Sequence, residues 1–273
     1  MMAVALAHVE YGAGPPVIIL HGLFGANANW TMVARRLAER FHVFALDLRN
    51  HGASPWAPRM DYAAMAEDVA GFIAAQGLDR AALIGHSMGG KIAMTLALSA
   101  PELVERLVVV DIAPTPRPPT HMAFVEAMLA LDLHGMTRRT AADAALQPSI
   151  PNDAERLFLL QNLVAGPDGL RWRLNLATIR DEMAQLSGFP ACDEAAAYRG
   201  PTLVIRGANS DYVEDRDLPE YARLFPAYRL VTLAGAGHWV HAERPTEFLA
   251  AVTPFLAGAW ARRFSRVSPA PTR

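Results

Sequence analysis

Gly85-His86-Ser87-Met88-Gly89-Gly90 is the stretch of this sequence that says most about its fold. It follows the apolar run Ala81–Ile84 and precedes a helical pattern that ends before Pro101. A glycine two residues to either side of a serine is typical of a sharp turn from a strand into a helix. Such a turn is too crowded for neighbouring side chains and exposes the serine hydroxyl at the carboxyl end of the strand. Ser87 is therefore a candidate nucleophile.

The segments on either side of this turn alternate between strand and helix patterns. Short runs that are apolar on both faces indicate the strands of a parallel sheet covered by helices. These runs are Val17–Leu20, Val43–Leu46, Ala81–Ile84, Leu107–Val110, Thr202–Ile205 and Leu230–Leu233. Apolar residues at helical spacing lie between them, most clearly over 61–76, where Asp61 is the expected N-cap. The sequence therefore predicts an α/β fold with a doubly wound parallel sheet.

The alternation stops after Asp111. A proline-rich linker, 113–120, is followed by helical patterns alone until the strands resume, and Trp172 belongs to one of these helical stripes. We interpret the interruption as a helical cap inserted into a single α/β core. The end of the chain is rich in proline, serine and arginine and is expected to form a flexible tail. The predicted parts are a core of residues 1–112 and 200–264, a cap of residues 113–199 and a tail of residues 265–273.

Charge and cysteine content exclude several classes of protein. The 273 residues carry 25 lysines and arginines against 27 aspartates and glutamates, so no general attraction to nucleic acid or anionic membranes is expected. Cys192 is the only cysteine, which excludes an intrachain disulfide and a thiolate zinc site. No apolar run approaches the roughly 20 residues of a membrane span, and the first residues lack the features of a signal peptide. We expect a soluble, cytoplasmic protein, whose oligomeric state does not follow from the sequence.

A serine hydroxyl needs a base, and His238 is the best candidate. It follows the last apolar run, and the carboxyl end of a parallel strand is where an active site is expected. An oxyanion needs amide donors. Met88, directly after the serine, is the first expected donor, and Leu23, after the first strand, is the second, with Phe24 as the alternative. No carboxylate or third histidine is spaced to complete a metal site with His238 and His241.

These motifs together resemble the α/β-hydrolase superfamily, in the order His21-Gly22, the serine turn, an aspartate and Gly237-His238. D-L-R-N-H-G-A-S at 47–54, the Lys91 after the turn and V-D-I-A-P at 110–114 resemble a narrower branch of small acyl esterases and thioesterases. The resemblance implies a mostly parallel sheet of eight strands and a helical cap inserted after the sixth. It also implies catalysis without a cofactor or a metal.

The acid that would orient His238 has two candidates. In most of the superfamily the acid follows the seventh strand, which points to Asp211. In the narrower branch it is the aspartate of V-D-I-A-P, which is Asp111. Both lie at strand ends, so position alone does not decide between them, and the closer resemblance favours Asp111. Asp47, a third carboxylate at a strand end, is expected to pair with Arg49.

The resemblance implies a serine hydrolase that cleaves small-molecule esters or thioesters with small to medium acyl groups through an acyl-enzyme. A carbon–carbon bond hydrolase and a cofactor-free haloperoxidase or perhydrolase use the same triad and are the alternatives. A non-catalytic ligand receptor is disfavoured because Ser87, His238 and an acid are all present. The apolar residues expected to line a pocket between sheet and cap are Phe24, Trp30, Phe124, Met128, Trp172 and Trp239.

Overall fold

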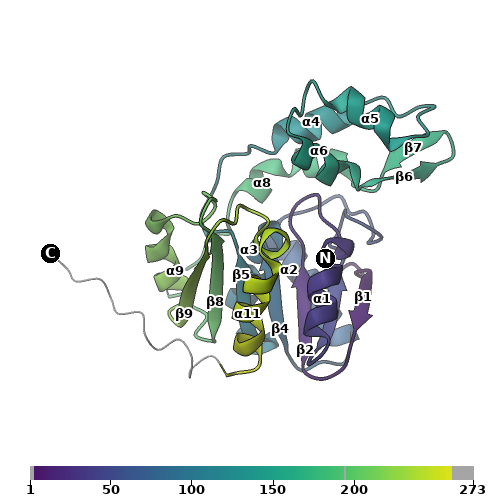
Figure 1. The fold of residues 1–273 in the computed structure, drawn as a ribbon. Coiled ribbons are helices and arrows are strands. Elements are labelled where there is room, and N and C mark those ends of the chain that lie inside the picture. The colour runs from purple at the N-terminus through teal and green to yellow at the C-terminus, as the bar shows by residue number, and fades with distance from the viewer. Residues whose placement is uncertain (1–2, 194, 260–273) are drawn as a thin grey trace.

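A seven-stranded sheet forms the centre of the protein in a computed structural model that describes residues 3–193 and 195–259 (Figure 1). The strand order is β1-β3-β2-β4-β5-β8-β9. The strands are β1 (His8–Tyr11), β2 (Pro16–Leu20), β3 (His42–Leu46), β4 (Ala81–His86), β5 (Val104–Val110), β8 (Thr202–Gly207) and β9 (Tyr228–Leu233). All neighbours pair in parallel except β1, which runs antiparallel to β3. The predicted α/β fold with a mostly parallel sheet is confirmed.

The number of strands differs from the expectation. The described residues form seven strands in this sheet, so the prediction of eight was wrong. The segment before β1 bonds to a helix instead of adding a strand, because the Val4 amide donates to Asp68 Oδ1 over 2.7 Å. Leu6 in the same segment is buried in the core. The strand that precedes the cap is consequently the fifth in the chain, β5, and not the sixth.

Helices cover both faces of the sheet, as its apolar strands require. One face carries α1 (Thr31–Leu37) and α11 (Pro245–Leu256), and the other carries α2 (Tyr62–Ala75), α3 (Met88–Ser99) and α9 (Leu218–Leu224) (Figure 1). Alternate side chains of β2 enter two separate core clusters: Val17 and Ile19 pack on the α1 side, and Ile18 and Leu20 on the α2 side. Asp61 caps α2 as predicted, accepting from the Ala64 amide over 2.9 Å.

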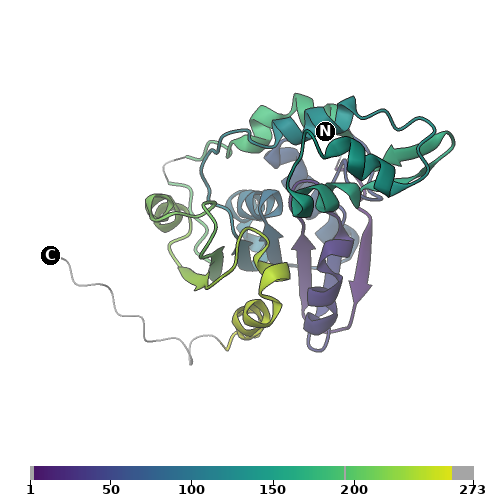
Figure 2. The same cartoon turned by 45° about the horizontal axis from the view of Figure 1, so that its top comes forward.

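Between β5 and β8 the chain forms a cap that lies over the carboxyl ends of the strands (Figures 1 and 2). Its elements are α4 (Met122–Ala130), α5 (Arg139–Leu146), α6 (Asp153–Leu160), β6 (Leu163–Gly166), β7 (Gly169–Trp172), α7 (Leu176–Asp181) and α8 (Met183–Ser187). The expectation of helices alone was wrong, because β6 and β7 pair as an antiparallel hairpin that includes Trp172. Gly166 and Gly169 face each other across Pro167-Asp168, a two-residue turn that ends any helix.

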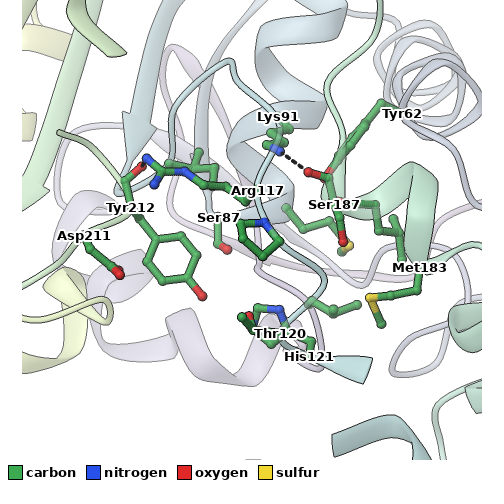
Figure 3. A pocket seen from close by; sticks show the side chains of 15 residues that line it. Tyr62, Ser87, Lys91, Arg117, Thr120, His121, Met183, Ser187, Asp211 and Tyr212 are labelled. Carbon is green, nitrogen blue, oxygen red and sulfur yellow. Dashed lines mark hydrogen bonds between the residues drawn. The ribbon is translucent and has the colours of Figure 1, made fainter. Parts of the chain in front are cut away.

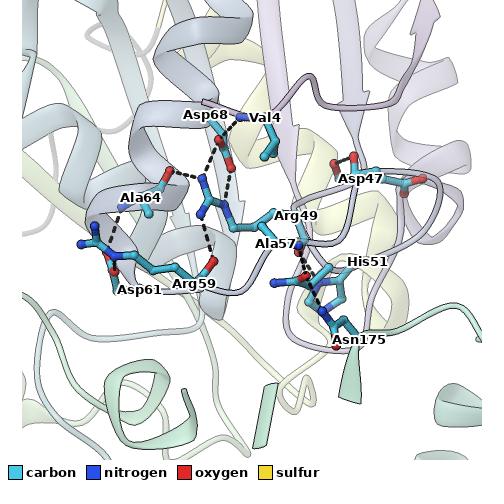
Figure 4. A network of polar contacts seen from close by, with 12 residues as sticks. Val4, Asp47, Arg49, His51, Ala57, Arg59, Asp61, Ala64, Asp68 and Asn175 are labelled. Carbon is cyan, nitrogen blue, oxygen red and sulfur yellow. Dashed lines mark hydrogen bonds and ion pairs between the residues drawn. The ribbon is translucent and has the colours of Figure 1, made fainter. Parts of the chain in front are cut away.

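The loop after β3 is fixed by two buried acids (Figure 4). Arg49 pairs with Asp68 on α2, with N–O distances of 2.5 and 2.7 Å, and Asp68 is almost completely buried. Asp47 accepts from the amides of Asn27 and Ala53 over 2.7 and 2.9 Å. The expected pairing of Asp47 with Arg49 was therefore wrong, since the guanidinium reaches across to α2 and Asp47 organises the loop backbone.

No helix in the described ranges is long and apolar enough to cross a membrane. The predicted flexible tail, 265–273, lies outside the described residues.

Candidate active site

Ser87 is the single residue between β4 and α3, and its backbone is strained. Its backbone angles are φ 51° and ψ −118°, a conformation that L-residues rarely adopt. The flanking glycines are required by space: a Cβ on Gly85 would lie 2.2 Å from the Gly89 carbonyl oxygen, and one on Gly89 would lie 2.3 Å from that of Leu20. The Ser87 amide donates to the Val110 carbonyl over 3.0 Å, which fixes the turn to β5. The serine is thereby presented at the carboxyl edge of the sheet, as the sequence predicts.

His238 lies in the loop after β9 and contacts Asp111 at the end of β5. The distance between His238 Nδ1 and Asp111 Oδ2 is 2.8 Å, and the Asp111 side chain is completely buried. Asp111 also accepts hydrogen bonds from the Gly207 amide, over 2.9 Å, and from the Ser210 hydroxyl. Because a carboxylate with these donors stays in one position, it can hold the imidazole with Nε2 directed outward. Of the two candidate acids, Asp111 is the one that contacts His238; Asp211 is exposed.

Two further side chains hold the imidazole and its loop. The ring of Tyr212 stacks on the ring of His238, with centroids 3.8 Å apart. His86 donates from Nε2 to the main-chain carbonyl of His238 over 2.9 Å, which ties the loop to the end of β4. Tyr212 is not among the predicted site residues, although it directly follows the candidate acid Asp211.

Two cavities meet at Ser87. The first has a volume of about 180 Å³ and is lined by Tyr62, Met88, Lys91, Arg117 and Met183 among others (Figure 3). The second has a volume of about 170 Å³ and is lined by His238, Trp239, Phe158 and Glu155 among others. Four residues line both cavities: Leu23, Ser87, His121 and Tyr212. The serine therefore divides the space between core and cap into two compartments, of which only the second is lined by His238.

The backbone amide of Phe24 donates a hydrogen bond within the protein, so it is not free to bind an oxyanion. It donates to His51 Nε2 over 3.2 Å, while His51 Nδ1 donates to the Arg49 carbonyl over 2.9 Å. This leaves Leu23 as the better of the two proposed donors from this loop. Leu23 and Met88 line the first cavity together with Ser87, so both proposed oxyanion donors lie beside the candidate nucleophile.

The predicted substrate-binding residues fall into two groups. Phe24, Trp30, Phe124 and Trp239 line the second cavity. Met128 and Trp172 line neither cavity beside Ser87. The indole N–H of Trp172 donates to the Met128 carbonyl over 3.1 Å, and Met128 is completely buried in the core cluster. Their apolar spacing reflects packing within the cap, so the structure does not support a role for these two in substrate contact.

Several histidines around the site are buried and neutral. Burial lowers the pKa of His21 to about 4 and those of His51 and His241 to about 3, and it lowers the pKa of His86 well below its ordinary value. His241 stacks on Trp30 with centroids 3.9 Å apart. Among the described residues, none forms a hydrogen bond with the buried His241 Nδ1. These rings therefore act at neutral pH as packing groups and uncharged donors or acceptors.

This burial predicts how stability depends on pH. A histidine whose pKa is lower in the folded state takes up protons on unfolding, so the stability it contributes falls as pH drops below about 6.5. The loss for each such histidine is about 1.4 kcal/mol per pH unit down to its folded pKa. We expect His241→Phe, which keeps the stack on Trp30, to make the decline in unfolding free energy shallower by about that amount.

Urea unfolding at about pH 7, 6 and 5 measures this slope. Replacement of the exposed His134 by glutamine is the control and should leave the slope as in the wild type. Equal slopes for His241→Phe and the wild type would show that His241 does not remain neutral in the folded protein.

The sheet, the serine turn and the paired His238 and Asp111 define an α/β hydrolase. A family model described as "alpha/beta hydrolase fold" matches residues 15–245, and the chain belongs to this family. Within the described residues no group of three or more histidine, cysteine, aspartate or glutamate side chains is arranged to hold a metal ion.

Similar proteins include lipases and esterases. The chain is 42% identical over 252 residues to the sn-1-specific diacylglycerol lipase ABHD11 of Mus musculus, a match that covers 89% of this chain and 81% of that protein. It is 36% identical to the esterase YbfF of Escherichia coli K12, over 88% of this chain and 92% of that one. A solved structure of a marine microorganism esterase superimposes with a TM-score of 0.90 at 37% identity, covering 93% of this chain and all of that one.

Proposed function

We propose that this protein is a serine hydrolase that cleaves carboxylic esters and thioesters of small to medium acyl groups. The observation that carries the proposal is the 2.8 Å contact between His238 and the buried Asp111, beside a cavity that Ser87 also lines. The similarity to proteins named as esterases and as a lipase supports the same class of reaction.

In this proposal Ser87 Oγ attacks the carbonyl carbon of the substrate and its proton passes to His238 Nε2. The carbonyl oxygen becomes negative and accepts from the amides of Leu23 and Met88. The bond to the leaving oxygen or sulfur then breaks, the leaving group takes the proton from His238, and the acyl group stays on Ser87. Water then attacks the acyl carbon as His238 takes one of its protons, the bond between that carbon and Ser87 Oγ breaks, and His238 returns the proton to Ser87 as the carboxylic acid is released.

We assign the two halves of the substrate to the two cavities because of the side on which His238 lies. His238 must reach the leaving atom to protonate it, and His238 lines only the second cavity. The leaving group therefore occupies the second cavity, against Phe158 and Trp239, and the acyl chain extends into the first. The volume of the first cavity, about 180 Å³, fits a small to medium acyl group.

A chain-length series of para-nitrophenyl esters and coenzyme A thioesters, combined with labelling by a fluorophosphonate probe, tests this function. We expect the probe to label Ser87 and turnover to be highest for small to medium chains. Turnover of a carbon–carbon substrate but not of esters, or peracid formation from hydrogen peroxide as the main activity, would favour the two alternative enzymes. A chain that neither reacts with the probe nor turns over any substrate would be a receptor.

We retain a cytoplasmic location as part of the proposal. Its support is that a chain with a single cysteine, Cys192, forms no intrachain disulfide, which suits a reducing compartment.

A further inference from the structure

Lys91 is the only lysine among the 273 residues, since the other 24 of the 25 basic residues are arginines. It lies on α3, one helical turn after Ser87, and lines the first cavity (Figure 3). Only 2% of its surface is exposed. A lysine is rarely buried to this extent unless its charge has a partner, so the environment of its ammonium group needs an explanation.

The contacts of the Lys91 ammonium are to neutral groups. Nζ donates to the main-chain carbonyls of Gly188 and Ser187, over 2.5 and 3.4 Å, and lies 5.7 Å from the centroid of the Tyr62 ring. Within the described residues no carboxylate forms an ion pair with it. An ammonium has three N–H donors, so one donor remains beyond the two carbonyls.

The other charged residues around the first cavity do not neutralise Lys91. The positive charge of Arg117 is neutralised by acids of its own, because its guanidinium pairs with Asp217 over 2.7 Å and with Glu214 over 3.6 Å. Asp211 also lines the cavity but lies beyond Ser87 and beside Tyr212 in Figure 3, on the side away from Lys91. Burial and the nearby Arg117 lower the pKa of Lys91 to about 8, so the charged form still prevails at pH 7.

An unbalanced positive charge in a site of low dielectric constant attracts an anion more strongly than the same charge in water. The proposed function places the acyl chain in this cavity, with its carbonyl at Ser87. Ser87 is the N-cap of α3 and Lys91 follows it by four residues, a rise of about 6 Å along the helix axis, which a short acyl chain can span. A negative group at the far end of that chain would meet the ammonium.

We propose that the first cavity selects acyl groups that end in a carboxylate, which pairs with the Lys91 ammonium. The substrate class is then the monoesters or monothioesters of short dicarboxylic acids. This inference rests on the proposed function, because it assumes that the acyl chain is attached through Ser87.

The first test compares two para-nitrophenyl esters on the wild-type protein. One is the adipate monoester, and the other is a neutral ester in which an isopropyl group replaces the terminal carboxylate and keeps its shape. We expect kcat/KM to be about 10- to 100-fold higher for the monoester, the effect of one hydrogen bond to a charged group. Equal values, or a preference for the neutral ester, would overturn the inference.

The second test applies both esters to Lys91→Met, which keeps an unbranched side chain one atom shorter and removes its charge. We expect the ratio of the two kcat/KM values to fall by about 10- to 100-fold. Arg36→Met, at an exposed position of α1, removes one positive charge elsewhere and should keep the wild-type ratio. If Lys91 only holds the loop at Ser187 and Gly188, Lys91→Met will lower the melting temperature and leave the ratio unchanged, which contradicts the inference.

The third test needs no variant. Protein labelled with lysine that carries ¹⁵N at Nζ gives one side-chain signal, because Lys91 is the only lysine. Adipate should shift this signal saturably, and acetate at equal ionic strength should not; no saturable shift with adipate would contradict the inference.

The outcomes separate this inference from the proposed function. Hydrolysis of the neutral ester without any preference rejects the inference and leaves the function standing. Failure of both esters and of fluorophosphonate labelling rejects the function itself.

Discussion

Ser87→Ala is expected to lower kcat for para-nitrophenyl esters by up to about 10⁶. The physical reason is that alanine removes the only atom that can bond to the acyl carbon. The oxyanion donors Leu23 and Met88 would remain, so a residual rate above water is expected. Steady-state kinetics with a short acyl ester measures the loss, and intact-protein mass spectrometry after fluorophosphonate treatment shows whether labelling disappears.

The same substitution should leave the fold intact. The positive φ of Ser87 is set by the glycines around it and by the hydrogen bond that its backbone N–H donates to the Val110 carbonyl, neither of which alanine changes. We therefore expect a melting temperature within a few degrees of the wild type, which corresponds to about 1 kcal/mol or less. Ser99→Ala, at the other end of α3, is the matched control and should keep full activity. Activity of Ser87→Ala within about tenfold of the wild type would exclude Ser87 as the nucleophile.

The parts of the fold that the sequence predicts correctly are those encoded locally. Each buried strand is a short apolar run, and the serine turn is specified by glycines whose absence of side chains prevents clashes below 2.5 Å. The β6–β7 hairpin was missed for an equally local reason. Its apolar residues also fit a helical stripe through Trp172, and the signal against a helix is confined to the turn Gly166-Pro167-Asp168-Gly169.

The site is less accessible to sequence reasoning because it depends on contacts between distant segments. Asp111 and Asp211 both follow strands. Which of them contacts His238, 127 residues after Asp111, depends on the paths of the loops that carry these residues. The position of Lys91 presents the same difficulty. Its sequence position after the serine turn is plain, but its neighbours are carbonyls of the cap, nearly 100 residues further along the chain.

Asp111→Asn is expected to lower kcat by about 10⁴, in line with the corresponding change in serine proteases. Asparagine keeps the shape of aspartate, and its amide oxygen can still accept from the Gly207 amide, as Oδ1 does now over 2.9 Å. The amide NH₂ would then face His238 Nδ1 in place of Oδ2. Because an NH₂ group donates, it favours the tautomer with the proton on Nε2, and a protonated Nε2 cannot accept the proton of Ser87.

Asp211→Asn is the matched control, because it makes the same chemical change at the other candidate acid. Asp211 is exposed and lies beside Tyr212, so we expect an effect within about tenfold on kcat. Measuring both variants with one ester over a range of pH compares the two acids directly. A large loss for Asp211→Asn with a small loss for Asp111→Asn would assign the acid to the loop after β8, as in most of the superfamily. Large losses for both would mean that Asp211 also supports His238, acting through the Tyr212 ring stacked on the imidazole at 3.8 Å.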